Sequence, residues 1–416
     1  MEEQKDPKEE NQEYSFLQET IKENRGGIRK FFFRAAGWGL VFGVCASLSF
    51  FALKPMLDER FQDNPQEVTI PQDEDEVEGE EENQDQEQTE PVILNDDSYR
   101  QMQQELKAAS VKAGKSMVEI VGWTESQGEA KEASGNNISG LIVADNGREL
   151  LVLGKKIPEE EAEKLQIVFC DGQSYPASLK KSDSILGFGI YAVNRADILD
   201  TTWTQIETAT LGSSNVVKNG DVIIAAGRPF GVNEAVGYGL VVSNEDRAEL
   251  TDGHYQLLRT DITGIENGSG FVVNRDGAVV AVIDQNMAEE GNEKLITGYG
   301  ISDIKNIIEC LSNGKSVPYI GIRGGDVTNE IEEAGVPQGI YVKEVEVEVE
   351  SPAMAAGIQS GDVITCIEDI QITSYDIYHS VLMRKSEGDK IIIKGLRQGA
   401  DGYVDIEFNV TVGSKK

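Results

Sequence analysis

Between residues 115 and 310, short apolar runs alternate with turns rich in Gly, Asn and Asp. Three such runs are QIVFC at 166–170, DVIIAAG at 221–227 and AVVAVI at 278–283. Many short strands at regular spacing, separated by turn residues, are typical of a β barrel or sandwich. A chain of 416 residues also has room for two or three domains. We therefore expect a mostly β protein in which this region forms the main core.

An uninterrupted apolar run at residues 35–53 contains no charged side chain. As a helix rising about 1.5 Å per residue, it would span the hydrocarbon layer of a membrane. Four basic residues, Arg25, Arg29, Lys30 and Arg34, precede the run at short distance, whereas only Lys54 follows it closely. This asymmetry predicts a cytoplasmic segment at 1–34 and an extracytoplasmic remainder. A cleaved signal peptide is the alternative, but the run starts late and lacks a small-residue cleavage site.

The formal net charge of −35 argues against nucleic acid as a partner, because phosphate binding relies on Lys and Arg. Residues 54–97 include the acidic run DEDEVEGEEE at 73–82, which predicts a solvated, disordered stalk. The spacing of the four cysteines indicates neither disulfides nor a zinc site, so no metal or cofactor is expected. Cys45 lies in the apolar run. The other three cysteines are expected at small positions in the core; they are Cys170, Cys310 and Cys366.

Several motifs occur in one order along residues 98–310. They are SGLIVADNGRELLVLGKK at 139–156, DSILGFGIYAV at 183–193, NGDVIIAAGRPFG at 219–231, TDITGIENGSGFVVNRDG at 260–277 and GYGISDI at 298–304. Together they resemble the trypsin-like protease domain of the HtrA/Deg family. The resemblance implies a double β-barrel with a catalytic His, Asp and Ser, in that chain order.

The three catalytic positions implied by the resemblance are altered. The histidine position falls on Lys155 and the aspartate position on Gly187. Counting back from Asn274 places Gly268 at the serine position, whereas counting forward leaves Ser269 as the only nucleophile candidate. A serine hydroxyl is a weak nucleophile without an adjacent base.

Other residues offer poor substitutes for the missing base. His254 follows an Asp-Gly turn signal, which predicts a solvated loop histidine. Lys155 is expected to face solvent, whereas a lysine base requires deep burial. Ser269 is therefore interpreted either as an ordinary turn residue or as a nucleophile whose general base the sequence does not reveal.

Residues 315–416 form a second predicted unit, of α+β type. The motif SPAMAAGIQSGDVI at 351–364 resembles the PDZ domain that follows the protease domain in HtrA proteins. By this resemblance the peptide-binding loop consists of Tyr319, Ile320, Gly321 and Ile322. Such a module adds an extended peptide to a sheet edge, and exposed loop N–H groups capture its terminal carboxylate. His379, on a helix expected at 374–385, lies either along the groove or on the surface.

The sequence thus predicts a single-pass, extracytoplasmic HtrA-like pseudoprotease that binds peptide or unfolded-protein C-termini. Its expected role is that of a chaperone, scaffold or regulator in protein quality control of the bacterial envelope. One alternative is an active serine endopeptidase that uses Ser269, and another is a structural protein that forms oligomers. Relatives of this type are commonly trimers, although no residue of this sequence specifies the oligomeric state.

Overall fold

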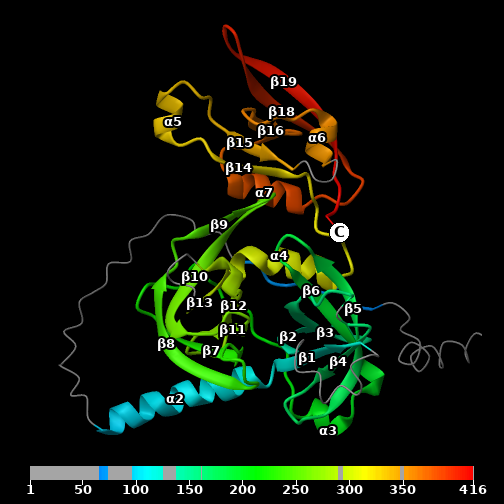
Figure 1. Cartoon of the computed structure of the whole chain (residues 1–416), viewed down its shortest axis with the longest axis vertical. Coiled ribbons are helices and arrows are strands. Elements are labelled where there is room, and N and C mark those ends of the chain that lie inside the picture. Colours follow the sequence, from blue (N-terminus) through cyan, green and yellow to red (C-terminus); the bar gives the residue numbers. More distant parts are fainter. Residues whose placement is uncertain are drawn as a thin grey trace, which may run out of the picture. The chain divides into compact units, whose positions relative to one another are not determined.

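The computed structural model describes residues 65–73, 96–124, 137–160, 162–288, 294–346 and 351–415. The predicted membrane span at 35–53 and the acidic run from 74 lie outside these residues. Within the described ranges, no helix is both long and apolar enough to cross a bilayer. The prediction of a mostly β chain with a double barrel and a C-terminal α+β domain is confirmed (Figure 1).

The first barrel is a closed ring in the order β1-β2-β3-β6-β5-β4. Its interior is apolar because alternate residues of each strand point inward, as Ile120, Val152 and Tyr191 do without any exposure. The strands are β1 Met117–Trp123, β2 Asn137–Asp145, β3 Glu149–Lys155, β4 Lys164–Val168, β5 Ser174–Asp183 and β6 Phe188–Asn194. They are followed by η2 Arg195–Asp197 and α3 Asp200–Trp203.

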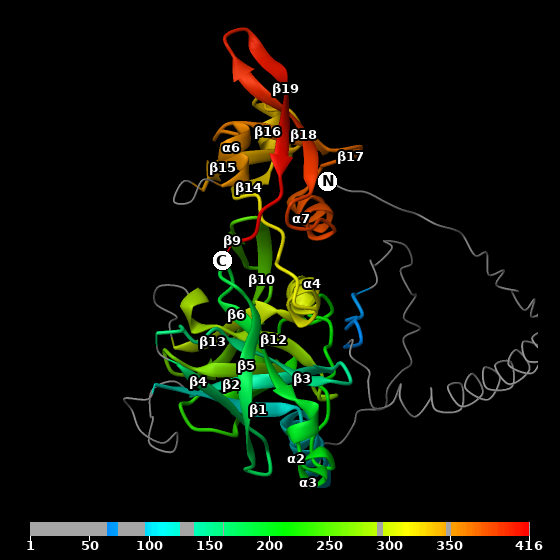
Figure 2. The same cartoon turned by 90° about the vertical axis from the view of Figure 1, so that its right-hand side faces the viewer.

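The second barrel has the strand order β13-β12-β11-β7-β8-β10 and is closed by pairing of β13 with β10. A seventh strand, β9, pairs only with β10, so these two strands form a hairpin that extends from the barrel (Figure 2). The strands are β7 Val222–Arg228, β8 Ala235–Ser243, β9 Arg247–Leu250, β10 Gly253–Thr263, β11 Ser269–Val273, β12 Val279–Ile283 and β13 Leu295–Gly300. The short helix η3 spans Gln285–Met287.

Two longer helices flank the barrels. Helix α2 (Asp96–Gly114) leads into β1, and α4 (Ile301–Ser312) follows β13. The apolar face of α4, which includes Ile304, Ile308 and Leu311, is buried in a core shared by strands of both barrels. This helix therefore holds the two barrels together, as an amphipathic helix does when its apolar stripe is covered.

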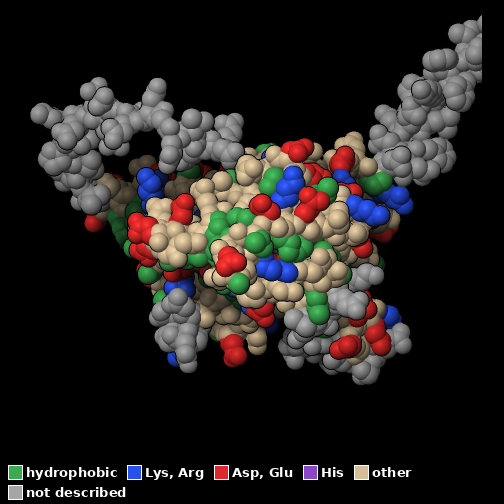
Figure 3. Space-filling view, turned by 90° about the horizontal axis from the view of Figure 1, so that it is seen from above, with side chains coloured by type: hydrophobic (Ala, Val, Ile, Leu, Met, Phe, Trp, Pro, Cys, Tyr) green, Lys and Arg blue, Asp and Glu red, His purple; other side chains and the backbone are tan. Residues whose placement is uncertain are grey.

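The C-terminal domain is a sheet in the order β14-β15-β16-β18-β19, with β17 paired to β16. Its elements are β14 Ile322–Asp326, α5 Asn329–Glu333, β15 Ile340–Val345, α6 Pro352–Ala356, β16 Val363–Ile367, β17 Ile370–Gln371, α7 Tyr375–Met383, β18 Lys390–Gly399 and β19 Gly402–Thr411. Seen from above, acidic, basic and hydrophobic side chains are interspersed on the exposed face (Figure 3).

The 351–364 motif determines how α6 begins and ends. The Ser351 hydroxyl accepts a hydrogen bond from the Met354 N–H at the helix start, where Pro352 occupies the first helical turn. Gly357 ends the helix with φ 87°, a left-handed conformation that favours glycine. Asp362 then forms a two-pronged ion pair with Arg397 on β18, with N–O distances of 2.6 and 2.7 Å. Local chemistry thus accounts for this part of the domain.

Residues 65–73, which we call the strap, lie along α4. Val68 exchanges two hydrogen bonds with the Asn313 side chain, at 2.8 and 2.7 Å. The Asp73 carboxylate contacts the Lys305 ammonium at 2.5 Å, and Lys305 has only 4% of its side chain exposed. The strap falls within the predicted stalk at 54–97, so the structure differs from the prediction there: two apolar residues, Val68 and Ile70, are buried.

Candidate functional site

Ser269, the only nucleophile candidate, begins β11 and joins the two barrels. Its hydroxyl accepts a hydrogen bond of 3.0 Å from the backbone N–H of Ser139, and the Ser139 hydroxyl donates to the Ser269 carbonyl at 3.2 Å. Both serines are buried, at 3% and 7% exposure. We call this reciprocal pair the serine clamp. In this arrangement the Ser269 hydroxyl satisfies a buried backbone donor on the first barrel.

The other two catalytic positions lack acid–base groups suited to a triad. Lys155 ends β3, and its ammonium lies 2.7 Å from the Asp284 carboxylate with a quarter of the side chain exposed. The expectation of a solvent-facing Lys155 is therefore wrong, because the side chain reaches across to the second barrel. Gly187 has φ 71°, and a side chain there would meet open space.

Gly268 has no room for the side chain that a catalytic serine requires. A Cβ atom built on this glycine would lie 2.8 Å from the Pro229 carbonyl oxygen and 2.9 Å from that of Ile265. Real Cβ atoms essentially never approach backbone oxygens this closely, so the surrounding backbone would have to move. Replacing Gly268 by serine would thus disturb the loop in addition to supplying a hydroxyl.

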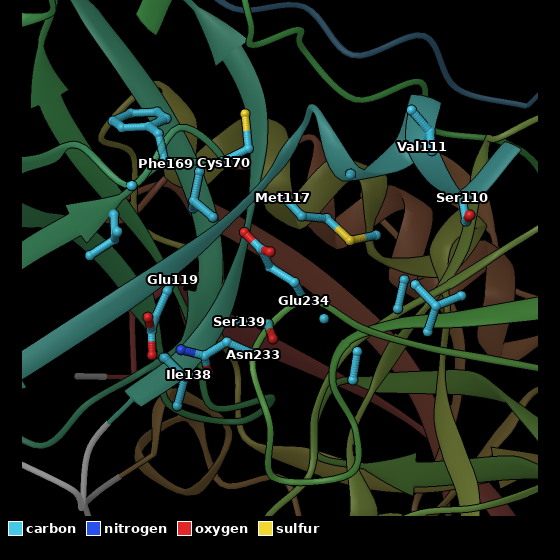
Figure 4. Close-up of a pocket in the computed structure, with 18 residues that line it drawn as sticks. Ser110, Val111, Met117, Glu119, Ile138, Ser139, Phe169, Cys170, Asn233 and Glu234 are labelled. Atoms are coloured by element: carbon cyan, nitrogen blue, oxygen red, sulfur yellow. The ribbon is translucent and has the colours of Figure 1, made fainter. Parts of the chain in front are cut away.

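A cavity of about 410 Å³ borders the serine clamp (Figure 4). Its lining comes from α2, β1, β2, the turn after β4, β7 and the start of β8, and includes Glu119, Ser139, Phe169 and Glu234. Cys170 also lines it and is exposed rather than in the predicted core position. Although the residue is exposed overall, partial loss of water around its thiol, followed by the nearby Asp171, raises the pKa of Cys170 above its ordinary value. The thiol is therefore poorly suited to nucleophilic attack.

The predicted peptide-binding loop forms a second candidate site, in the C-terminal domain. Backbone N–H groups of Ile320 and Gly321 both donate to Oδ2 of Asp252 at 2.7 Å, and that of Ile322 donates to Oδ1 at 3.0 Å. The Tyr378 hydroxyl on α7 donates to the same Oδ1 at 2.6 Å. The loop thus holds a carboxylate through three converging amides, as a nest does.

The carboxylate in this loop comes from the tip of the β9–β10 hairpin. Asp252 is 4% exposed, and its φ of 59° is unusual for a residue other than glycine. Burial raises the pKa of the Asp252 carboxyl, although the hydrogen bonds from Tyr378 and the loop amides act to lower it. Gly321, with φ 95°, could not carry a side chain, because a Cβ there would lie 2.5 Å from the Ser351 Cβ.

Both histidines of the chain lie at this contact. His254 stacks on Tyr375 of α7 with ring centroids 3.8 Å apart, and its Nε2 lies 3.0 Å from the Gly324 carbonyl. The prediction of a solvated loop histidine is therefore wrong: the ring is half-buried, and burial lowers its pKa. His379 lies 2.8 Å from the Asp252 carbonyl through Nδ1. Each ring is thus engaged away from the serine clamp.

Sequence reasoning did not find Asp252, His254 or Tyr378 as parts of the peptide-loop site. No local pattern marks them, because Asp252 meets Gly321 across 69 positions of sequence. Among the described residues, no cluster of His, Cys, Asp and Glu is arranged to hold a metal ion.

Comparison with known proteins defines the class of both domains. A model of the trypsin-like peptidase domain matches residues 139–282, and a PDZ domain model matches residues 318–408. The chain thus combines a trypsin-like peptidase domain with a PDZ domain, and it is homologous to the DegP/HtrA serine proteases.

Individual relatives agree with this assignment. Serine protease Do-like HtrB of Bacillus subtilis (strain 168) is 27% identical over 282 residues, which cover 63% of this chain and 59% of that protein. Periplasmic serine endoprotease DegP of Escherichia coli (strain K12) is 26% identical over 283 residues, covering 65% and 56%. The chain spans less than two thirds of the length of these relatives. The solved HtrA-type protease AlgW with tripeptide shares the fold, with TM-score 0.54, 21% identity and coverage of 74% and 97%.

Proposed function

We propose that this protein is a membrane-anchored, extracytoplasmic HtrA-like pseudoprotease that binds peptide or protein C-termini through its PDZ domain. The observation that carries the proposal is the convergence of the Ile320, Gly321 and Ile322 amides on one carboxylate. A C-terminal carboxylate offers the same two oxygens to the loop. Relatives of known structure include an HtrA-type protease with a bound decapeptide, which supports a peptide ligand.

The pseudoprotease part of the proposal rests on the inter-barrel residues. Ser269 is engaged in the serine clamp, Lys155 is paired with Asp284, and both histidines lie at the hairpin contact. Acyl transfer by a serine requires a base within hydrogen-bond reach of the hydroxyl. Among the described residues, the base that the family places there is absent.

The anchor and the localisation rest on the sequence alone. The apolar run at 35–53, with basic residues before it, supports a single span with the N-terminus in the cytoplasm. Both folded domains would then lie on the outer face, where exposed C-termini of envelope proteins are the ligands. Protease accessibility of the folded domains in intact cells and in spheroplasts tests this topology. Protection of both domains in spheroplasts would reject it.

An active serine endopeptidase is the second candidate, because the named relatives are serine proteases. Turnover of casein and of fluorogenic peptides by the purified chain, beside a Ser269→Ala variant, separates the two functions. We expect no turnover in either protein. Turnover by the native chain that disappears in Ser269→Ala would establish the enzyme and reject the pseudoprotease.

Peptide recognition is tested separately by isothermal titration with peptides that differ only at the C-terminus. We expect binding of the free carboxylate and none of the amide, since the amide loses the charge and one acceptor that the loop amides require. Equal binding of both forms would show that the loop does not recognise C-termini.

A further inference from the structure

The β9–β10 hairpin contacts the PDZ domain in the manner of a bound peptide. Besides the three bonds to its carboxylate, the Asp252 N–H donates to the Ile322 carbonyl at 2.8 Å. One residue therefore both fills the amide loop and pairs with the first residue of β14. These are the two kinds of contact that an added strand makes at a sheet edge when its end carries a carboxylate.

The hairpin also occupies the space between β14 and α7. His254 is sandwiched there, stacked on Tyr375 and directed at the Gly324 carbonyl of β14. A carbonyl can only accept, so the His254 Nε2 carries the hydrogen of this bond. Figures 1 and 2 show β9 and β10 reaching β14 and α7 from the second barrel. Another extended chain has no place in this part of the groove while the hairpin is present.

Several features favour a contact that can be reversed. The Asp252 carboxylate accepts hydrogen bonds from three backbone amides and one phenol, and none of these four donors carries a positive charge. A buried carboxylate that has no cationic partner recovers less of the free energy lost on leaving water than a carboxylate paired with a cation does. The left-handed backbone of Asp252 adds local strain, because residues other than glycine seldom adopt it.

The surrounding ion pairs add little to this contact. They join Glu249 to Lys343 at 2.6 Å and Arg247 to Asp376 at 3.0 Å, and the four side chains are between 48% and 65% exposed. Exposed pairs of this kind typically contribute little to stability and are weakened by salt. The contact therefore depends mainly on Asp252 and His254.

We propose that the β9–β10 hairpin is an intramolecular ligand of the PDZ groove, with the Asp252 carboxylate in the place of a peptide C-terminus. Each loop amide has a single hydrogen, so an external carboxylate must displace Asp252 before it can bind. Peptide binding then separates the PDZ groove from the second barrel. This inference rests on the proposed function, because it assumes that the amide loop recognises C-terminal carboxylates.

The Asp252→Asn substitution tests the competition in the full chain. Asparagine tolerates the left-handed backbone but replaces one acceptor oxygen by an NH2 group, which faces the loop donors. The probe is a fluorescein-labelled decapeptide pool, random in nine positions and ending in valine with a free carboxylate; the amidated pool is the control. We expect Asp252→Asn to bind the free pool at least about tenfold more tightly than the native chain in fluorescence anisotropy, a difference of about 1.4 kcal/mol.

The matched control is Glu249→Gln, which removes a rim charge on the same hairpin and is expected to change affinity less than about twofold. Equal affinity of the native chain and Asp252→Asn for the free pool would overturn the competition and leave the proposed function standing. Failure of both proteins to bind the free pool would overturn the proposed function and the inference with it.

Hydrogen exchange of the native chain provides a second readout that needs no variant. With the free pool at saturation, we expect the Asp252 amide to exchange faster, because its bond to Ile322 is broken, while the Gly321 amide stays protected by the peptide. Binding with unchanged exchange at Asp252 would overturn the inference, even if Asp252→Asn failed to fold.

Discussion

Replacing Ser269 by alanine separates a structural serine from a catalytic one. The substitution leaves the Cβ in place and removes only the hydroxyl that accepts the Ser139 N–H at 3.0 Å. Ser139 is 7% exposed, so its N–H would lose its acceptor in a position that is largely shielded from bulk water. Leaving a buried donor unsatisfied costs about 1–3 kcal/mol. We therefore expect Ser269→Ala to lower the free energy of unfolding by about 2 kcal/mol.

The assay is urea unfolding followed by tryptophan fluorescence, since Trp123 and Trp203 both belong to the first barrel, one side of the clamp. Ser174→Ala is the control: Ser174 is exposed on β5, and its loss should change stability by less than about 0.5 kcal/mol. Unchanged stability of Ser269→Ala, together with a loss of peptidase turnover, would refute the clamp and identify Ser269 as a nucleophile.

Three further predictions concern charged groups. Burial raises the pKa of Asp73, but hydrogen bonds from Lys305, Ser302 and Ser213 outweigh it and hold this pKa below its ordinary value of 3.8. The contribution of Asp73 to strap binding is therefore complete above that pH and is lost as the pH falls below it; protease sensitivity of residues 65–73 at pH 3 and pH 7 measures the change. Arg397→Ala leaves Asp362, 1% exposed, without its cation and should destabilise the PDZ domain by about 3–5 kcal/mol in thermal unfolding. Burial lowers the pKa of His254 from its ordinary value of 6.5, so the stabilisation that the neutral ring gives to the hairpin contact is lost as the pH falls below 6.5. NMR titration of the imidazole measures this pKa, and we expect a lower value in the native chain than in Asp252→Asn.

Those parts of the fold that depend on local pattern were predictable from the sequence. The 351–364 motif contains the serine, proline and glycine that begin and end α6, and the helix expected at 374–385 is observed at 375–383. The strand runs of the barrels were recognisable for the same reason, because each is a short apolar run bounded by turn residues such as Gly, Asn and Asp.

The candidate sites depended on contacts that local pattern does not encode. Asp252 looked like part of a turn, and the turn is real, but the three amides that bind its carboxylate lie 68–70 positions away and the Tyr378 hydroxyl lies 126 positions away. Lys155 stood beside acidic residues that predicted exposure, whereas its partner Asp284 is 129 positions distant. For Ser269 the motif fixed the place in the fold, but only the structure shows that its hydroxyl bonds to Ser139.

The strap has a consequence for how far the folded domains can stand from a membrane. Only residues 54–64, eleven positions, separate the proposed span from the strap, and even fully extended they reach at most ~40 Å. The acidic run follows the strap in sequence, and the chain is described again from α2, so the residues on either side of 74–95 both belong to the folded body. If residues 35–53 span a membrane as proposed, the length of 74–95 would not limit the distance of the PDZ groove from the bilayer, whereas each residue added to 54–64 would raise that limit by about 3.5 Å.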